Sequence, residues 1–265
     1  MGGWGGWLAA ETALAFRVPP LSIPVPLMSE AELIALLADA QRNGTHTIDP
    51  TLFAGIDRAA AYRVQTGVTA ALGWTVGMLK TAIHSDGIGA AGSIYAQHVG
   101  RSGFRLPVAN VLGLELEVGV VLGKDIPAGT TDVAPYVDHY FTGIEIVGSR
   151  FTDRSKAGPN GGMADNFSSL CYVIGTEPRP LRDSLDGLTV TLEFAGSQIW
   201  AAPARHGFGT VLASVAAYAA SPDRVYPLTA GTIITTGSLC GLVPTTGPGH
   251  VVGRLGNDRV EFDLV

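Results

Sequence analysis

The sequence predicts an α+β fold, because helical and extended patterns occupy different parts of the chain. In the amino-terminal third, apolar residues recur at the spacing of an amphipathic helix. From Trp74 onward the chain changes to short β-branched runs separated by Gly, Pro, Asn and Asp. Only one later segment has helical periodicity, so the pattern argues against a regular alternation of strands and helices.

The helices are predicted from their boundaries as well as from their periodicity. Ser29 and Glu32 have the spacing of a capping box, and the first helical run stops at Asn43. A second helix is expected over 57–73, where a glycine ends it. The later helix is expected over about 210–220, just before a proline.

The predicted strands are short and widely spaced. They cover residues 74–78, 114–122, 142–147, 171–174, 188–194, 232–236 and 259–264. We expect a helical region, 28–73, to pack as one compact unit with a β-rich region, 74–265. Residues 1–27 are rich in Gly, Trp and Pro, and they are expected to form an amino-terminal arm, either extended against a neighbouring subunit or with little structure.

Composition limits the partners that this chain can have. Its 265 residues include 46% hydrophobic ones and carry a formal net charge of −6, with no cluster of Lys and Arg. This argues for a folded protein with a small-molecule partner, and against nucleic acid or an anionic membrane. The two cysteines, Cys171 and Cys240, cannot form a disulfide framework, so a reducing cytoplasm fits best.

Glu115 and Glu117 lie in the alternating segment 114–122. Because side chains alternate across a strand, the apolar residues share one face and both carboxylates project from the other. Glu145 stands in a second strand-like segment, 142–147. Carboxylates that lie close together repel one another, and three such oxygen ligands suit Mg²⁺ or Mn²⁺. A solvated sheet face that binds nothing is the alternative.

Other residues offer acid/base chemistry without a specific motif. The segment 87–92 satisfies G-x-G-x-x-G, but it lacks a leading strand and a following helix, so a dinucleotide site is not expected. His84 and His98 flank this segment. Histidine is the usual acid or base near neutral pH, although a structural or solvated role is more common for any one of them.

Several segments together resemble the 2-keto-4-pentenoate hydratase and 4-oxalocrotonate decarboxylase branch of the fumarylacetoacetate hydrolase superfamily. The resemblance runs from about Ser29 to the end of the chain. Its segments are Ala61, Tyr62 and Gln65, then 73–77, 115–125, 144–150, 164–169 and 236–243.

The resemblance implies a mixed β roll with helices packed around it, usually in a homo-oligomer. It also implies that the three glutamates hold Mg²⁺ or Mn²⁺, which binds the carboxylate and 2-oxo oxygens of a 2-oxo acid or its dienol. Gly237 and Ser238 then resemble the substrate-carboxylate side of the pocket. Asp165 is expected to position either the substrate or its own loop, with turn capping as the alternative.

The chain departs from the family pattern in the groups that move protons. Thr75, which is expected to bind the substrate, stands where the family has its acid/base lysine, and threonine cannot perform that proton transfer. The family's acidic pair in the following segment is also missing. His98, His84 and Lys80 are therefore the catalytic candidates, although the position of Lys80 also suits a surface lysine.

The resemblance, together with these candidates, implies a metal-dependent lyase that acts on a 2-oxo acid or its dienol, most simply a hydratase of a 2-hydroxy-2,4-dienoate. A decarboxylase, C–C hydrolase or tautomerase for a related 2-oxo or 1,3-dicarbonyl acid is the first alternative. A weakly active or inactive paralogue that serves as a partner subunit is the second. Relatives of this kind act in aromatic degradation, so a decarboxylase or aldolase is a further expected partner.

Overall fold

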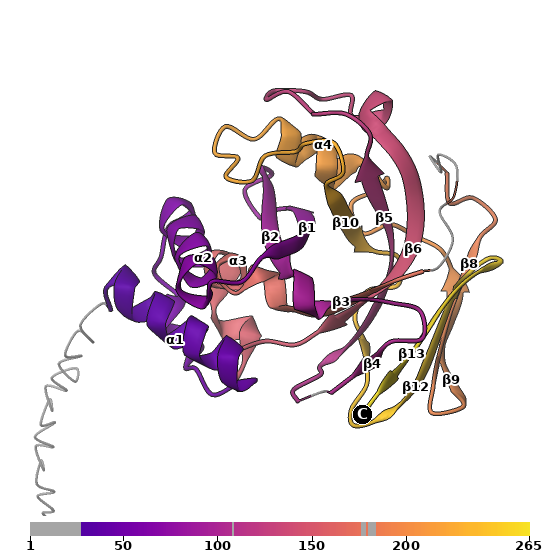
Figure 1. The fold of residues 1–265 in the computed structure, drawn as a ribbon, viewed down its shortest axis with the longest axis horizontal. Helices are drawn as coiled ribbons and strands as arrows, with labels where there is room; N and C mark the ends of the chain where they lie inside the picture. The colour runs from indigo at the N-terminus through magenta and orange to yellow at the C-terminus, as the bar shows by residue number, and fades with distance from the viewer. Residues whose placement is uncertain (1–27, 108, 176–178, 180–183) are drawn as a thin grey trace, which may run out of the picture.

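The structure is a computed structural model that describes residues 28–107, 109–175, 179 and 184–265. The predicted arm, residues 1–27, lies outside these described residues. Two β-sheets and a group of helices make up the fold, so the α+β prediction is confirmed (Figure 1). No helix among the described residues is both long and apolar enough to cross a membrane.

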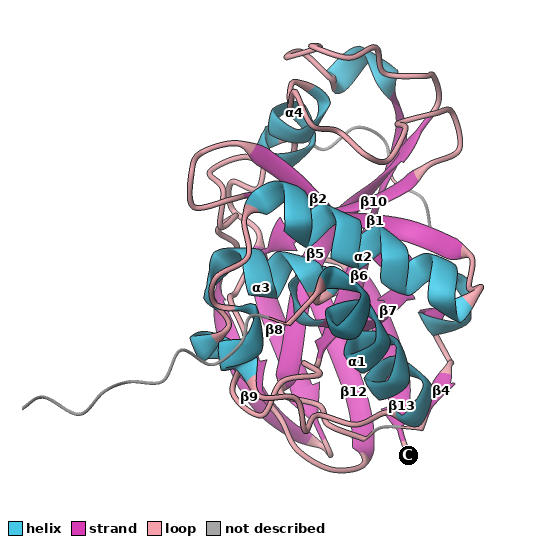
Figure 2. Ribbon diagram, turned by 90° about the vertical axis from the view of Figure 1, so that its left-hand side faces the viewer, coloured by secondary structure: helices cyan, strands magenta, loops and turns pink. Residues whose placement is uncertain are grey.

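The two amino-terminal helices form where their caps predict. Helix α1 spans Glu30–Asn43 and begins with the capping box of Ser29 and Glu32. Helix α2 spans Arg58–Leu72 and ends at Gly73, whose positive φ of 66° suits glycine. The two helices pack on each other and lie with α3 (Gly158–Ala164) on one side of the molecule (Figure 2).

The larger sheet has eight strands in the order β2-β1-β10-β5-β6-β7-β3, with β11 paired to β5. Their bounds are β1 Val76–Ile83, β2 Gly89–Tyr95, β3 Val99–Arg101, β5 Gly113–Leu122, β6 Val137–Val147, β7 Ser169–Ile174, β10 Ile233–Ser238 and β11 Val243–Pro244. Both parallel and antiparallel pairs occur, as in the parallel pair of β1 with β10 and the antiparallel pair of β5 with β6. The mixed sheet expected from the resemblance is therefore present.

The smaller sheet has five strands in the order β4-β13-β12-β8-β9. They are β4 Arg105–Leu106, β8 Thr189–Phe194, β9 Ser197–Pro203, β12 Gly249–Leu255 and β13 Asp258–Leu264. This sheet packs against the apolar face of β5 and β6. Gly253 of β12 has no room for a Cβ, because that atom would overlap the side chains of Ile144 and Leu116. The core between the sheets includes the apolar side chains that alternate with the glutamates on β5.

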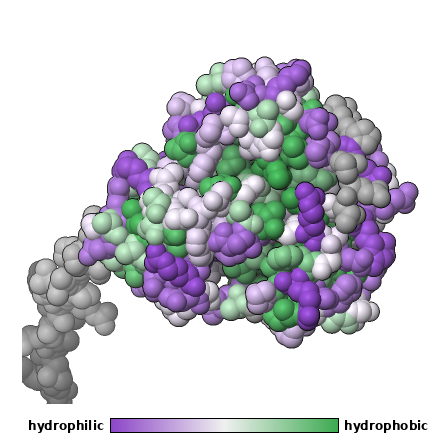
Figure 3. Space-filling model, in the orientation of Figure 1, coloured by the Kyte–Doolittle hydropathy of each residue, from purple (hydrophilic) through white to green (hydrophobic). Residues whose placement is uncertain are grey.

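Shorter helices complete the described chain. They are α4 Ala213–Ala219 and the 3₁₀ turns η1 Pro50–Phe53, η2 Ala96–His98, η3 Ala134–Tyr136, η4 Arg154–Lys156 and η5 Asn166–Ser168. Helix α4 packs on β1 and β2. The glycine-rich segment rejected as a dinucleotide loop is largely strand β2. On the face drawn in Figure 3, apolar residues gather over the centre and hydrophilic residues surround them.

Candidate metal centre

Strands β5 and β6 bring the three predicted glutamates together. Glu115 lies directly opposite Glu145 in the antiparallel pair, and Glu117 follows two residues later on the same face of β5. One carboxylate oxygen from each residue lies within 4.8 Å of the other two. We call Glu115, Glu117 and Glu145 the glutamate cluster.

Two carboxylates of the cluster, those of Glu117 and Glu145, are buried, and within the described chain each has one oxygen with a hydrogen-bond partner and one without. We call these two the inner glutamates. The side chains of Glu117 and Glu145 are fully buried, whereas that of Glu115 is 16% exposed. The Thr235 hydroxyl donates to Oε2 of Glu117, and Lys80 Nζ donates to Oε1 of Glu145 over 2.7 Å. Among the residues that the structure describes, Oε1 of Glu117 and Oε2 of Glu145 have no hydrogen-bond partner. Each inner glutamate therefore has one oxygen held by the protein and one left over.

The electrostatics of the cluster disfavour three ionised carboxylates. Burial raises the pKa of Glu145 to about 7, against the opposing effect of Lys80. Burial, followed by the charge of Glu145, raises the pKa of Glu117 well above its usual range. One ammonium does not compensate three carboxylates, so three ionised glutamates would leave an excess of negative charge beside the two buried carboxylates, Glu117 and Glu145.

This donor set fits a hard divalent cation. Unpaired buried carboxylate oxygens are rare, because each costs about 1–3 kcal/mol, and a cation would satisfy them together. The alternative of a solvated sheet face fails for Glu117 and Glu145, since neither side chain contacts solvent. The residues present would suit Mg²⁺ or Mn²⁺, the ions predicted from the sequence.

Lys80 reaches the cluster from a strand that is distant in sequence. It lies on β1, which pairs with β10, and β10 in turn pairs with β5. Its Nζ is 2.7 Å from Glu145 and 3.8 Å from Glu115, and its side chain is only 12% exposed. Burial disfavours the ammonium, but the surrounding carboxylates outweigh burial and raise the pKa of Lys80. The alternative of a surface lysine is therefore wrong.

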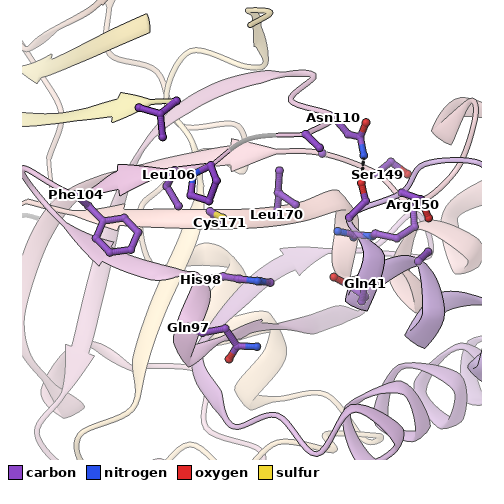
Figure 4. Close-up of a pocket in the computed structure, with 17 residues that line it drawn as sticks. Gln41, Gln97, His98, Phe104, Leu106, Asn110, Ser149, Arg150, Leu170 and Cys171 are labelled. Atoms are coloured by element: carbon purple, nitrogen blue, oxygen red, sulfur yellow. Dashed lines mark hydrogen bonds between the residues drawn. The ribbon is translucent and has the colours of Figure 1, made fainter. Parts of the chain in front are cut away.

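The structure places the two candidate histidines elsewhere. His98 packs edge-on against Trp74 and Tyr95, with ring centroids 5.4 and 6.2 Å away. It lines a cavity of about 500 Å³ with Gln97 and Arg150 (Figure 4), and no member of the glutamate cluster lines that cavity. His84 lies beyond the end of β1, where its Nδ1 is 3.3 Å from Asp86. Among the described residues, neither histidine contacts the glutamate cluster.

The predicted substrate-binding residues are divided between two regions. Thr75 is exposed just before β1, and its carbonyl accepts from the backbone of Ala96. Asp165 is fully buried, where it pairs with Arg150 and accepts from the Ser149 hydroxyl over 2.9 Å. Its carboxylate is therefore occupied within the fold, which favours a positioning role over contact with substrate.

Gly237 and Ser238 lie in a β-bulge beside the cluster. The register of β10 shifts between Thr235 and Ser238, and Ser238 pairs with Glu117. Gly237 has φ of 118°, a conformation that favours glycine. Nε2 of the buried His206 lies 3.1 Å from the Thr236 hydroxyl, and this contact ties the bulge to a neighbouring segment. Gly237 and Ser238 therefore stand beside Glu117 of the cluster, and their contact with a substrate carboxylate stays a prediction.

Two residues of the site were not predicted from the sequence. Thr235 contacts Glu117, and the hydroxyl of Tyr172 lies 3.2 Å from the Thr235 hydroxyl. Both residues belong to strands whose mostly apolar sequences indicate packing in the core. A threonine within a β-branched run is common, so the sequence offers little to separate Thr235 from a packing residue.

The structure has an α+β fold with buried carboxylates, and comparison with known proteins identifies its family. Residues 89–261 match the family model described as fumarylacetoacetate (FAA) hydrolase C-terminal. The chain belongs to this family, and it is an enzyme of the superfamily predicted from the sequence.

Named relatives fall in the predicted branch. The chain is 28% identical over 258 residues to a 2-keto-4-pentenoate hydratase of Burkholderia vietnamiensis, covering 88% of this chain and 97% of the relative. It is 28% identical over 232 residues to a TodF product hydratase of Pseudomonas putida, covering 80% and 86% of the two chains. The fold is similar to that of 4-oxalocrotonate decarboxylase from Pseudomonas putida G7, complexed with magnesium and adipate. That structure aligns with a TM-score of 0.76 at 23% identity, covering 90% of this chain and 99% of the other.

Proposed function

We propose that this protein is a divalent-metal-dependent hydro-lyase that adds water to a 2-hydroxy-2,4-dienoate, the reaction type of 2-keto-4-pentenoate hydratases. The observation that carries the proposal is the pair of unpaired oxygens on Glu117 and Glu145 within the glutamate cluster. The similarity to the two hydratase relatives supports the reaction type. The magnesium bound to the fold neighbour supports the choice of cofactor.

Each residue of the centre has a distinct part in this proposal. The glutamate cluster would hold Mg²⁺ or Mn²⁺, and the bound ion would act as a Lewis acid toward the carboxylate and 2-oxo oxygens of the substrate. Among the described residues, Lys80 is the positively charged side chain that contacts the cluster. It is proposed to take over the proton transfer that the lysine performs in the family. Ser238 and the backbone at Gly237 are proposed to orient the substrate carboxylate.

His98 and His84 remain candidates with weaker support, since neither contacts the cluster among the described residues. Thr75 and Asp165 are proposed to act through the shape of the site rather than by proton transfer. Cytoplasmic location and a homo-oligomer with a decarboxylase or aldolase partner belong to the same proposal. So does the organisation in which residues 28–73 and 74–265 form one compact unit.

One specific feature supports a second candidate. Thr75 occupies the position of the family lysine, as expected in a weakly active or inactive paralogue that serves as a partner subunit. The location of Lys80 counts against this candidate, because a cation still reaches the carboxylates. Decarboxylation, C–C hydrolysis or tautomerisation would use the same metal and would differ in product.

The test is Mg²⁺-dependent loss of the absorbance of 2-hydroxypenta-2,4-dienoate, with the product identified as hydrated acid or carbon dioxide. Lys80→Met is expected to lower kcat by about 100-fold or more, since general acid/base catalysis contributes about 10²–10⁴. Lys124→Met is the matched control, because Lys124 is exposed. A metal-binding wild type without turnover would favour the paralogue, and an active Lys80→Met variant would remove Lys80 from the mechanism.

A further inference from the structure

Glu117 is held by a residue that stands at the bulge of β10. The Thr235 hydroxyl donates to Oε2 of Glu117, while Oε1 stays unpaired. Thr235 is the last residue before the register of β10 against β5 shifts. The contact with Thr235 fixes one oxygen of a buried carboxylate and leaves the other available.

Thr235 also contacts Tyr172, a residue outside the glutamate cluster. The hydroxyl of Tyr172 lies 3.2 Å from the Thr235 hydroxyl, and Tyr172 is fully buried. Tyr172 stands on β7 directly opposite Glu145 of β6, so its ring extends over the same face of the sheet as the glutamates.

Two glycines on this face each make room for an aromatic ring. A Cβ at Gly143 would overlap the Tyr172 ring, and a Cβ at Gly119 would overlap the ring of Phe141. The rings of Phe141 and Tyr172 pack edge to face, with centroids 6.2 Å apart. The glycines on this face of β5 and β6 therefore leave room for the ring of Tyr172, whose hydroxyl lies beside Thr235.

The Thr235 hydroxyl contacts both Glu117 and Tyr172. It is placed to donate to Oε2 of Glu117 and to the phenol oxygen of Tyr172. A threonine hydroxyl has one hydrogen, so these two neighbours together set the orientation of the hydroxyl.

We propose that Tyr172 is a positioning residue of the metal centre, which acts through Thr235 to orient Glu117 and keep its free oxygen directed at the cation. This inference rests on the proposed metal-dependent function and adds an outer layer to it. Outer hydrogen-bond partners of metal ligands fix the orientation of the ligand, and their loss typically costs 10–100-fold in affinity. Lys80 has the equivalent contact with Glu145.

The test is Mn²⁺ binding to the metal-free full chain, measured by isothermal titration calorimetry and by the electron paramagnetic resonance signal of free Mn²⁺. Tyr172→Phe removes one oxygen without changing the ring, and it is expected to weaken Mn²⁺ binding by about 10-fold. Thr235→Val is expected to weaken binding further, and Thr235→Ser to retain most of it. Tyr226→Phe is the matched control, because Tyr226 is a largely buried tyrosine whose hydroxyl bonds Gln65 and Ser93 instead.

Coupling separates this role from a general loss of packing. If Tyr172 acts through Thr235, the double variant Tyr172→Phe, Thr235→Val binds Mn²⁺ no more weakly than Thr235→Val alone. Wild-type affinity in Tyr172→Phe, or additive losses in the double variant, would overturn the inference. A wild type that binds Mn²⁺ without hydratase turnover refutes the proposed reaction and leaves the positioning role intact. If Thr235→Val does not fold, the inference is decided by comparing the Mn²⁺ affinity of Tyr172→Phe with that of Tyr226→Phe.

Discussion

Two buried groups of charges in this protein differ in balance. In the pair of Arg150 and Asp165, one cation meets one anion, and both carboxylate oxygens of Asp165 accept hydrogen bonds. Arg150 also donates to the backbone carbonyls of Ser169 and Asp165. In the glutamate cluster, three carboxylates meet one described cation, Lys80, and within the described part of the chain two of their oxygens have no hydrogen-bond partner.

The difference indicates which group is structural and which is functional. A buried ion pair is tolerated when every polar atom has a partner, as for Arg150 and Asp165. An unbalanced group with unpaired oxygens is costly unless a ligand completes it. The sequence resemblance assigned site roles to residues of both groups, and the hydrogen bonds separate them.

Breaking the balanced pair should have the largest effect on stability. Asp165→Ala leaves the Arg150 guanidinium buried and uncompensated, and we expect the free energy of unfolding to fall by about 3–5 kcal/mol. Urea denaturation followed by circular dichroism measures this loss. A loss below about 1 kcal/mol would show that the pair does not hold the fold together.

The free energy of unfolding should depend on pH through His206, the histidine that contacts Thr236 in the β10 bulge. Burial lowers the pKa of His206 to about 4, and the Phe208 N–H donates to its Nδ1 over 3.2 Å. The unfolded chain takes up this proton near pH 6.5, so stability is present above that pH and falls as the pH drops toward 4. The loss is about 3 kcal/mol at most, and His206→Gln should reduce the slope. An unchanged slope in His206→Gln would contradict this assignment.

A bound ion should stabilise the protein through the unbalanced cluster. At a free Mg²⁺ concentration of about 100 times Kd, the expected gain is about 2.7 kcal/mol. Thermal unfolding with and without Mg²⁺ measures the gain, and Glu117→Gln should abolish most of it. Glu261→Gln is the control, since Glu261 lies at the surface in contact with Arg259. Equal gains in the two variants would locate the ion elsewhere.

Removing one charge from the cluster should have the smallest effect, with the opposite sign to that of Asp165→Ala. Without metal, Glu117→Gln relieves repulsion among buried carboxylates, so stability should rise by about 1 kcal/mol. Denaturation in the presence of a chelator measures this change. A marked loss of stability would mean that the cluster is balanced by contacts within the chain.

The strand pattern alone was sufficient to predict the glutamate face. The apolar residues of β5 are buried between the sheets, and Glu115 and Glu117 project from the opposite face. This succeeded because alternation along a strand is a local property. The caps of α1 and α2 were predicted for the same reason, since each depends on residues within one turn.

Features that depend on strand order could not be predicted in this way. Lys80 meets Glu145 because β10 places β1 near β5, and no local pattern in the sequence contains that order. Strand β2 was missed because Gly, Ala and Ser dominate it, although all its residues are buried. The turn at Asn166–Ser168 has three consecutive residues with positive φ, which only the surrounding packing can impose.

The central claim is that the glutamate cluster binds a divalent cation, and anomalous diffraction from a crystal grown with Mn²⁺ tests it most directly. We predict one anomalous peak bounded by Glu115, Glu117 and Glu145, with carboxylate oxygens about 2.1 Å from it. No peak at this position, with Lys80 alone still in contact with Glu145 and Glu115, would contradict the claim.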